Sequence, residues 1–174
     1  MKSLNRRIIA LLTSAAVVGV VTTSAHAADN DKIARGEYLT AVATCSDCHT
    51  PGVFADNPDH TRFLGGSDTA FEVPGLGAFV GGNLTPDQKT GIGKWTIDQI
   101  VTTLQTEMRP DGTALPPGIH SKGYKSFSKE DLTAISTYLK SIAAVNNEVP
   151  GPFKPGEKVT TSLIRQLPPG ATAQ

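Results

Sequence analysis

The sequence has only two cysteines among its 174 residues, Cys45 and Cys48, and this scarcity limits how the pair is used. A structural zinc site needs four ligands, and the chain offers neither a second cysteine pair nor a closely spaced histidine pair. A thioredoxin-like dithiol requires a βαβ setting, whereas a helical pattern precedes Cys45 and a Gly/Pro-rich stretch follows Cys48. A disulfide between residues three apart would close a very small loop and stabilise little.

Aromatic residues and excess charge are also scarce. Aromatic side chains make up 6% of the chain, and the formal net charge is +0. A balanced charge disfavours a nucleic-acid-binding protein and a polybasic membrane-binding surface. With 17 glycines and 12 prolines, the chain has many turns and little material for a core. A large apolar cofactor that supplies part of the core would explain how such a chain folds.

Long apolar runs are limited to the N-terminus. The uncharged run at 8–21 is short for a membrane span, which needs about 20 residues. It follows the basic pair Arg6-Arg7 and precedes the small-x-small sequence at 25–27, so residues 1–27 are predicted to be a signal peptide. Its removal takes away three positive charges and no negative ones, which leaves a mildly acidic chain. We therefore expect export to the bacterial periplasm.

The two cysteines belong to a C-x-x-C-H sequence that ends at His49. This spacing is the signature of covalent c-type haem attachment, in which each thiol forms a thioether with one vinyl group of the porphyrin. The adjacent histidine then binds the iron. Attachment requires reduced thiols in an oxidising compartment, which agrees with the predicted export. We therefore predict one covalent haem c, held by Cys45, Cys48 and His49.

Three segments carry the signals of α-helices. The first begins near 29–31 and ends at Cys45, and its internal Gly36 marks a place where another element comes close. The second begins at the N-cap candidate Thr96 and carries an apolar stripe that includes Met108. The third begins at Ser128 and runs to about residue 142.

Residues 50–93 show little periodicity and many turn signals, which is unusual inside a compact domain unless the stretch wraps a cofactor. Its larger apolar side chains either line a haem pocket or form an ordinary satellite core. These are Phe54, Phe63, Leu64, Phe71, Leu76, Phe79 and Val80.

Further short stretches have a familiar spacing along the chain. They are G-E-Y-L-T at 36–40, C-S-D-C-H at 45–49, G-N-L-T-P-D-Q-K-T-G-I-G-K-W at 82–95, R-P-D-G at 109–112, S-K-E-D-L at 128–132 and T-Y-L at 137–139. With this layout the chain resembles the class I cytochromes c, in particular the cytochrome c subunits and domains of bacterial periplasmic dehydrogenases. The resemblance implies an all-α cytochrome c fold, with three main helices and long loops around one haem, in which the first and last helices cross near Gly36 and Tyr138. We expect this domain to cover 28–150, with a Pro/Gly-rich tail at 151–174.

The resemblance implies electron transfer rather than catalysis. The expected donor is a periplasmic dehydrogenase, and the acceptor is an oxidase of the respiratory chain or another cytochrome, with room for a peripheral membrane contact. The alternative is a haem enzyme or gas sensor, which needs an open iron position and acid/base groups above it. Loop residues that could serve there are His60, Arg62, Arg109 and His120.

The chain departs from the family at the sixth iron ligand, because Ile119 occupies the position where relatives usually carry a methionine. Three side chains compete for the role. Met108 falls on the apolar stripe of the second helix, where a methionine usually packs in the core. His60 lies in a charged loop, whereas His120 is one residue from the family position and follows a stiff Pro-Pro-Gly sequence. We therefore predict that His49 and His120 together bind the iron.

Overall fold

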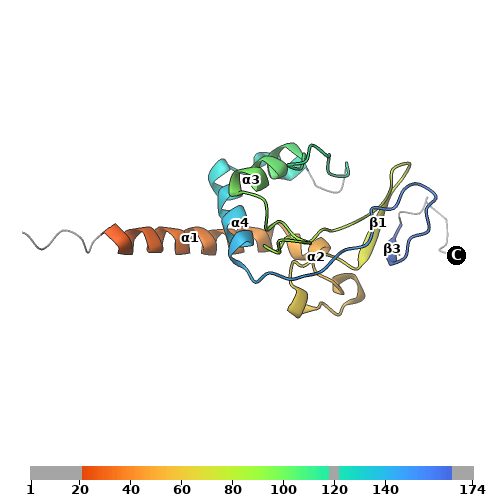
Figure 1. Ribbon diagram of the computed structural model, residues 1–174, viewed down its shortest axis with the longest axis horizontal. Helices are drawn as coiled ribbons and strands as arrows, with labels where there is room; N and C mark the ends of the chain where they lie inside the picture. Colours follow the sequence, from red (N-terminus) through yellow and green to blue (C-terminus); the bar gives the residue numbers. More distant parts are fainter. Residues whose placement is uncertain (1–20, 118–121, 166–174) are drawn as a thin grey trace, which may run out of the picture.

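The structure is a computed structural model that describes residues 21–117 and 122–165 (Figure 1). Its α-helices are α1 (Val21–Val42), α2 (Cys45–His49), α3 (Ile97–Thr106) and α4 (Lys129–Ser141). Its strands are β1 (Thr69–Val73), β2 (Gly77–Val80) and β3 (Ser162–Ile164). Short 3-10 helices are η1 (Val53–Ala55), η2 (His60–Arg62) and η3 (Lys122–Ser126). Among the described residues, no helix is both long enough and apolar enough to span a bilayer.

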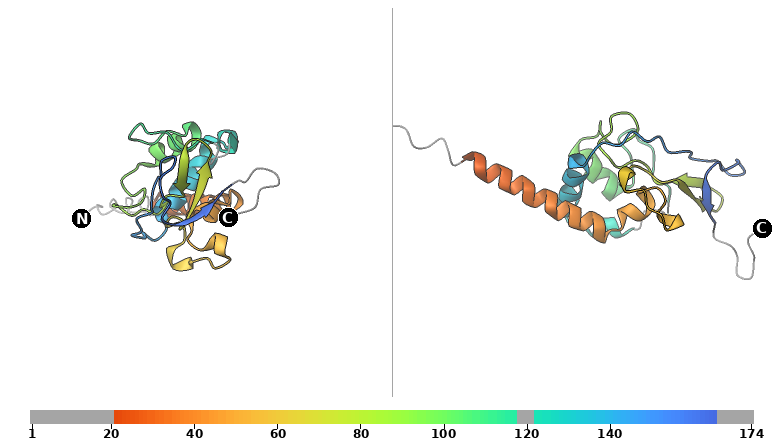
Figure 2. Two further views of the ribbon diagram at one scale, coloured as in Figure 1. Left: turned by 90° about the vertical axis from the view of Figure 1, so that its right-hand side faces the viewer. Right: turned by 90° about the horizontal axis from the view of Figure 1, so that it is seen from below.

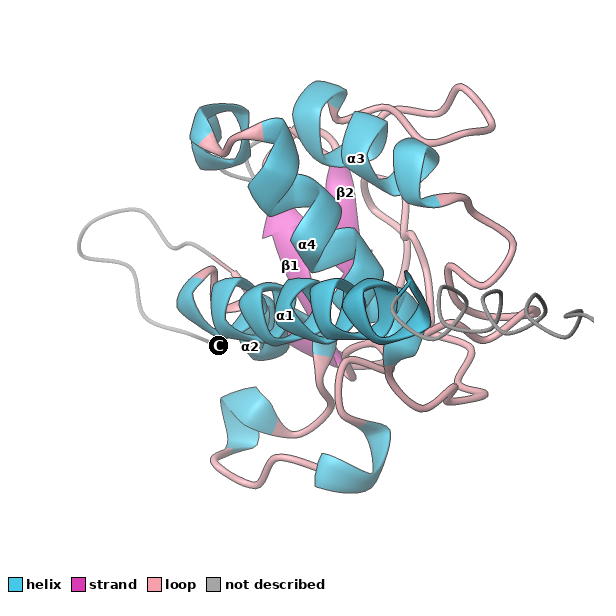
Figure 3. Ribbon diagram, turned by 90° about the vertical axis from the view of Figure 1, so that its left-hand side faces the viewer, coloured by secondary structure: helices cyan, strands magenta, loops and turns pink. Residues whose placement is uncertain are grey.

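The helices α1 and α4 cross each other, and Figure 3 shows α4 running obliquely to α1. Gly36 permits this crossing, because a Cβ at that position would lie 2.1 Å from the carbonyl oxygen of Ala134 and 2.7 Å from Cβ of Tyr138. The predicted crossing near Gly36 and Tyr138 is therefore confirmed. The first turns of α1 extend away from the rest of the described chain (Figure 2), so the helix begins earlier than the N-cap candidates at 29–31 predict.

Side-chain caps fix the starts of the other two long helices where the sequence predicts them. The Thr96 hydroxyl accepts a hydrogen bond from the backbone N–H of Gln99, and the Gln99 side chain accepts one from the backbone N–H of Thr96. The Ser128 hydroxyl accepts a hydrogen bond from the backbone N–H of Asp131 at 3.0 Å. Both caps satisfy N–H groups that the first turn of a helix leaves without partners.

A small sheet with the strand order β2-β1-β3 corrects the all-α prediction: the fold is mostly helical but not purely so. The antiparallel strands β1 and β2 form a hairpin whose turn contains Gly75 at a φ of 78°. The parallel strand β3 comes from the C-terminal segment and pairs with the other edge of β1. These strands have only five, four and three residues, which is too few for a period-2 pattern to stand out among glycines and prolines.

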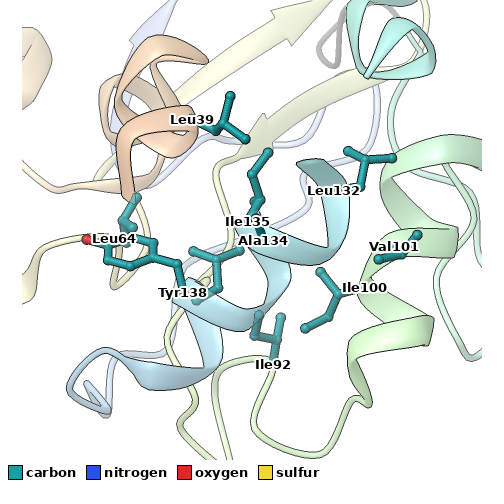
Figure 4. Packing of buried hydrophobic residues seen from close by; sticks show 10 residues of the cluster. Leu39, Leu64, Ile92, Ile100, Val101, Leu132, Ala134, Ile135 and Tyr138 are labelled. Carbon is teal, nitrogen blue, oxygen red and sulfur yellow. The ribbon is translucent and has the colours of Figure 1, made fainter. Parts of the chain in front are cut away.

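The main core lies where α1, α3 and α4 meet, and Figure 4 shows their side chains converging there. Its buried members are Leu39, Leu64, Ile92, Ile100, Val101, Leu132, Ala134, Ile135, Tyr138 and Leu139. A second, smaller cluster of Ala70, Ala78 and Phe153 joins the hairpin to the C-terminal segment. Of the apolar residues in 50–93, Leu64 enters the main core, whereas Phe54, Phe63 and Leu76 are exposed, so the seven do not form one satellite core.

Candidate haem-binding site

The C-x-x-C-H residues form the one-turn helix α2. Thr44, in the left-handed conformation at a φ of 53°, separates α2 from the end of α1 and redirects the chain. Residues three apart lie on the same face of a helix, so the thiols of Cys45 and Cys48 face the same side. Both cysteines are free and half-buried. The C-x-x-C spacing therefore places both thiols on one face of α2.

Burial keeps both thiols in the neutral form. Removal from water raises the pKa of the Cys45 thiol above its usual value, and the hydrogen bond from the Tyr124 hydroxyl offsets only part of this rise. Burial raises the pKa of Cys48 as well, and the nearby Asp47 carboxylate adds to the effect. A thiol whose pKa lies above the usual value is protonated at neutral pH, so both cysteines are thiols rather than thiolates in this fold.

The imidazole of His49 is held through its Nδ1 nitrogen. Its Nδ1 lies 2.6 Å from the carbonyl oxygen of Gly82. A carbonyl only accepts hydrogen bonds, so Nδ1 carries the hydrogen and Nε2 carries the lone pair of the neutral ring. A hydrogen bond of this kind fixes the orientation of a ligating imidazole and raises its basicity. The residues present therefore fit a haem iron bound through Nε2 of His49.

Gly81 lets the chain bring this carbonyl close to α2. A Cβ at Gly81 would lie 1.7 Å from the carbonyl oxygen of Cys48, so only glycine allows the chain to pass here. The backbone N–H of Ser67 donates to the Gly81 carbonyl at 2.9 Å and fixes this segment from the other side. The sequence indicates a turn at this Gly-Gly pair but not its contact with α2. The only hint of this contact in the sequence is that the Gly-Gly pair directly precedes the N-L-T-P-D stretch.

The loop that begins at Gly82 is anchored at its other end by α4. The Lys140 ammonium group donates hydrogen bonds to the carbonyl oxygens of Gly93 at 2.7 Å and Trp95 at 3.0 Å. Because an ammonium group donates but never accepts, a site lined by backbone carbonyls suits it. The stretch 82–95, typical of the resembled family, is therefore the connection between α2 and α4.

The other predicted ligand candidates have different outcomes. His120 and Ile119 lie at 118–121, outside the described residues, so the role of His120 stays a prediction. The placement of Met108 on the buried stripe of α3 is wrong. The helix ends at Thr106, Glu107 takes the left-handed conformation at a φ of 60°, and Met108 is 42% exposed. His60 is exposed in η2, as its charged surroundings suggest.

Within the described ranges, no three His, Cys, Asp or Glu side chains are grouped so as to bind a metal ion on their own.

The chain is similar in sequence to cytochrome subunits of bacterial dehydrogenases. No family model matches the chain. It is 33% identical over 116 residues to the fructose dehydrogenase cytochrome subunit of Gluconobacter japonicus, a match that covers 67% of this chain and 22% of that protein. It is 35% identical over 118 residues to the alcohol dehydrogenase (quinone) cytochrome c subunit of Komagataeibacter europaeus, covering 66% and 25%. It is 31% identical over 148 residues to the gluconate 2-dehydrogenase cytochrome c subunit of Pantoea cypripedii, covering 80% and 32%.

The chain resembles the cytochrome c subunits of bacterial dehydrogenases. This resemblance, expected from the sequence, is confirmed, and it implies haem c as the cofactor. The cysteines of α2 have the spacing that such a cytochrome needs. The chain spans between a fifth and a third of the length of these three relatives, so the activity of a whole relative does not transfer to it directly.

Proposed function

We propose that the chain is a one-haem c-type cytochrome that carries electrons from a dehydrogenase toward the respiratory chain. The observation that supports this most directly is the His49–Gly82 hydrogen bond beside two neutral, co-facing thiols. When bound, haem c supplies an iron that alternates between the ferric and ferrous states. In this proposal Cys45 and Cys48 hold the group through thioethers, His49 binds its iron, and Gly82 orients the imidazole.

Covalent attachment is the first property to test. Acid acetone should leave the haem on the polypeptide of the purified protein, and the mass should exceed that of the mature chain by one haem. Cys45→Ala should remove one thioether, whereas Ser46→Ala between the cysteines should leave attachment unchanged. Complete extraction of the colour from the wild type would contradict the proposal.

For the sixth ligand we propose His120, with Met108 as the alternative. The exposure of Met108 removes the packing argument against it, so the choice depends on the spectrum of the oxidised protein. Imidazole is a harder donor than a thioether and favours ferric iron, so His49/His120 ligation should give a lower potential than in His/Met relatives. His120→Ala should then become high-spin and bind carbon monoxide on reduction, and Met108→Leu should not. The reverse pattern would assign Met108.

The proposed partners are a periplasmic dehydrogenase as donor and an oxidase or another cytochrome as acceptor. The support is that the similar proteins are named as cytochrome subunits of dehydrogenases. A purified dehydrogenase of the fructose, alcohol or gluconate class should reduce the protein, and the rate should fall with added salt if exposed charges steer the encounter. Turnover of hydrogen peroxide well above that of free haem would favour the haem-enzyme alternative.

Export is proposed from the N-terminal sequence. Residues 1–27 should be removed, so the periplasmic protein should begin at Ala28 and its α1 should be shorter than the helix that starts at Val21. N-terminal sequencing of the periplasmic fraction tests this. A mature protein that retains Arg6 and Arg7 would contradict it.

A further inference from the structure

A hydrogen-bonded path leads from His49 into the loop at 82–95. The imidazole Nδ1 donates to the carbonyl oxygen of Gly82 at 2.6 Å, and the next residue is Asn83. Asn83 is buried, at 5% exposed, and its Nδ2 donates to the Thr90 hydroxyl at 3.0 Å and to the carbonyl oxygen of Val145 at 2.7 Å. Its Oδ1 accepts hydrogen bonds from the backbone N–H and the hydroxyl of Thr85. All four hydrogen-bonding positions of the amide are therefore used.

A second path returns from Thr90 to His49. The Thr90 hydroxyl accepts a hydrogen bond from the backbone N–H of Asn147 at 3.1 Å. The side-chain Nδ2 of Asn147 donates to the carbonyl oxygen of Gly65 at 2.8 Å. The next residue, Gly66, donates its backbone N–H to the carbonyl oxygen of His49 at 2.8 Å. The two paths form a closed ring that begins and ends at the same histidine, which we call the Asn83–Asn147 ring.

The ring joins three segments that are distant in the sequence. Gly65 and Gly66 precede the hairpin, Asn83 and Thr90 belong to the 82–95 loop, and Asn147 follows α4. Asn83, Gly65 and Gly66 are buried, whereas Thr90 and Asn147 are half-buried. Connected hydrogen bonds of this kind restrict the geometry of the groups that they join. The imidazole and the backbone of His49 are therefore fixed against each other through protein atoms on both sides.

We propose that Asn83 and Asn147 are positioning residues that set how strongly His49 donates electrons to the haem iron, and through it the reduction potential. This inference rests on the proposed function, because it assumes that Nε2 of His49 binds the iron. A hydrogen bond from Nδ1 to a carbonyl raises the basicity of the ligating nitrogen, which favours the ferric state. Loosening either the Gly82 carbonyl or the backbone of His49 weakens this bond, so the potential rises. The polar segment after α4 thereby influences the iron through His49.

The experiment uses the haem-loaded protein in a spectroelectrochemical titration. Asn147→Ala removes the hydrogen bond to Gly65 and keeps the backbone N–H that binds Thr90. At one fixed applied potential it should increase the ferrous-to-ferric ratio by about threefold, which corresponds to about 28 mV for a one-electron couple. Asn146→Ala is the matched control. Asn146 is the exposed neighbouring asparagine, whose side chain makes no hydrogen bond to the described residues, so the ratio should not change.

A second pair of variants covers the case in which Asn147→Ala folds poorly. Thr90→Val keeps the shape of the side chain but removes the hydroxyl shared by Asn83 and Asn147, so the ratio should rise as well. Thr90→Ser retains the hydroxyl and should restore the wild-type ratio.

The outcomes separate the two proposals. If these side chains had a purely structural role, Asn147→Ala and Thr90→Val would lower the midpoint of urea unfolding but leave the reduction potential unchanged. That result would overturn this inference and leave the proposed function standing. An equal shift in Asn146→Ala would also overturn it. A wild-type protein without covalently bound haem would overturn the proposed function and this inference together.

Discussion

Thr40 on α1 and Thr50 after α2 are both buried, yet their hydroxyl groups have different surroundings. Thr40 is 2% exposed, and its Oγ1 has no hydrogen-bond partner among the described residues. The Thr50 hydroxyl, in contrast, accepts a hydrogen bond from the backbone N–H of Leu64 at 3.0 Å. A buried polar group without a partner costs free energy, whereas a shared hydrogen bond contributes to stability.

The same substitution should therefore have opposite effects at the two positions. Thr40→Val removes an unpaired hydroxyl and should raise the free energy of unfolding by about 1 kcal/mol. Thr50→Val leaves the N–H of Leu64 without an acceptor and should lower the free energy of unfolding by about 1–3 kcal/mol. Urea unfolding of the haem-loaded variants measures both values. Shifts of the same sign would show that the Thr40 hydroxyl has a partner after all.

Asp87 links the stability of the 82–95 loop to pH. Hydrogen bonds from the backbone N–H and hydroxyl of Thr90, and from the backbone N–H of Lys89, lower the pKa of its carboxyl group below 3.8. A lowered folded-state pKa means that this stabilisation is fully present above pH 3.8 and is lost as the pH falls through the folded-state value. Asp87→Asn should therefore lose less stability than the wild type on acidification, as measured by urea unfolding at several pH values. Equal losses in the two proteins would contradict the assignment.

The candidate haem-binding residues Cys45, Cys48 and His49 can be predicted from the sequence, because the type and spacing of side chains are directly visible in it. The partner of His49 is a backbone carbonyl, which any residue at position 82 would carry, so the sequence does not single it out. Asn147 was missed because its partners lie far away in the chain. Met108 was misplaced because α3 ends at a left-handed Glu107, and glutamate is not a signal for a helix end.

At the scale of elements, the crossing of α1 and α4 depends on the missing side chain of Gly36. In an exposed helix, Gly→Ala stabilises by about 1 kcal/mol. At Gly36 the added Cβ would meet the backbone of Ala134, so Gly36→Ala should instead destabilise by about 1–3 kcal/mol. Ala34→Gly, at an exposed position on the same helix, measures only the difference in helix propensity between alanine and glycine. Thermal unfolding of both variants tests the sign, and a stabilised Gly36→Ala would rule out this close contact.

The sequence predicts the helices better than the sheet for a physical reason. A helix is signalled locally, by the Thr96 and Ser128 caps and by apolar residues three and four apart. The sheet needs β3, whose partner strand lies far along the chain, and the register appears only when the C-terminal segment has folded back. The hairpin itself is hidden among residues that are typical of loops.

At the scale of the whole molecule, the C-terminal segment contacts both edges of the hairpin. Phe153 exchanges two backbone hydrogen bonds of 2.9 Å with Ala78 of β2, and β3 then pairs with β1. Phe153 is 7% exposed and belongs to the second cluster, which is separate from the core formed by α1, α3 and α4. The described residues thus form two apolar clusters, and of these two only the larger has a cysteine of α2, Cys45, packed against it.

This division predicts that stability and haem properties respond to different substitutions. Phe153→Ala removes the largest side chain of the second cluster and should lower the free energy of unfolding by about 3 kcal/mol. The reduction potential and the spectrum should stay at the wild-type values, because none of the residues in the Asn83–Asn147 ring belongs to that cluster. Asn147→Ala should show the opposite profile, with a shifted potential and a smaller loss of stability. If Phe153→Ala shifted the potential as much as Asn147→Ala, the two clusters would be coupled, and the potential would report general loosening of the fold.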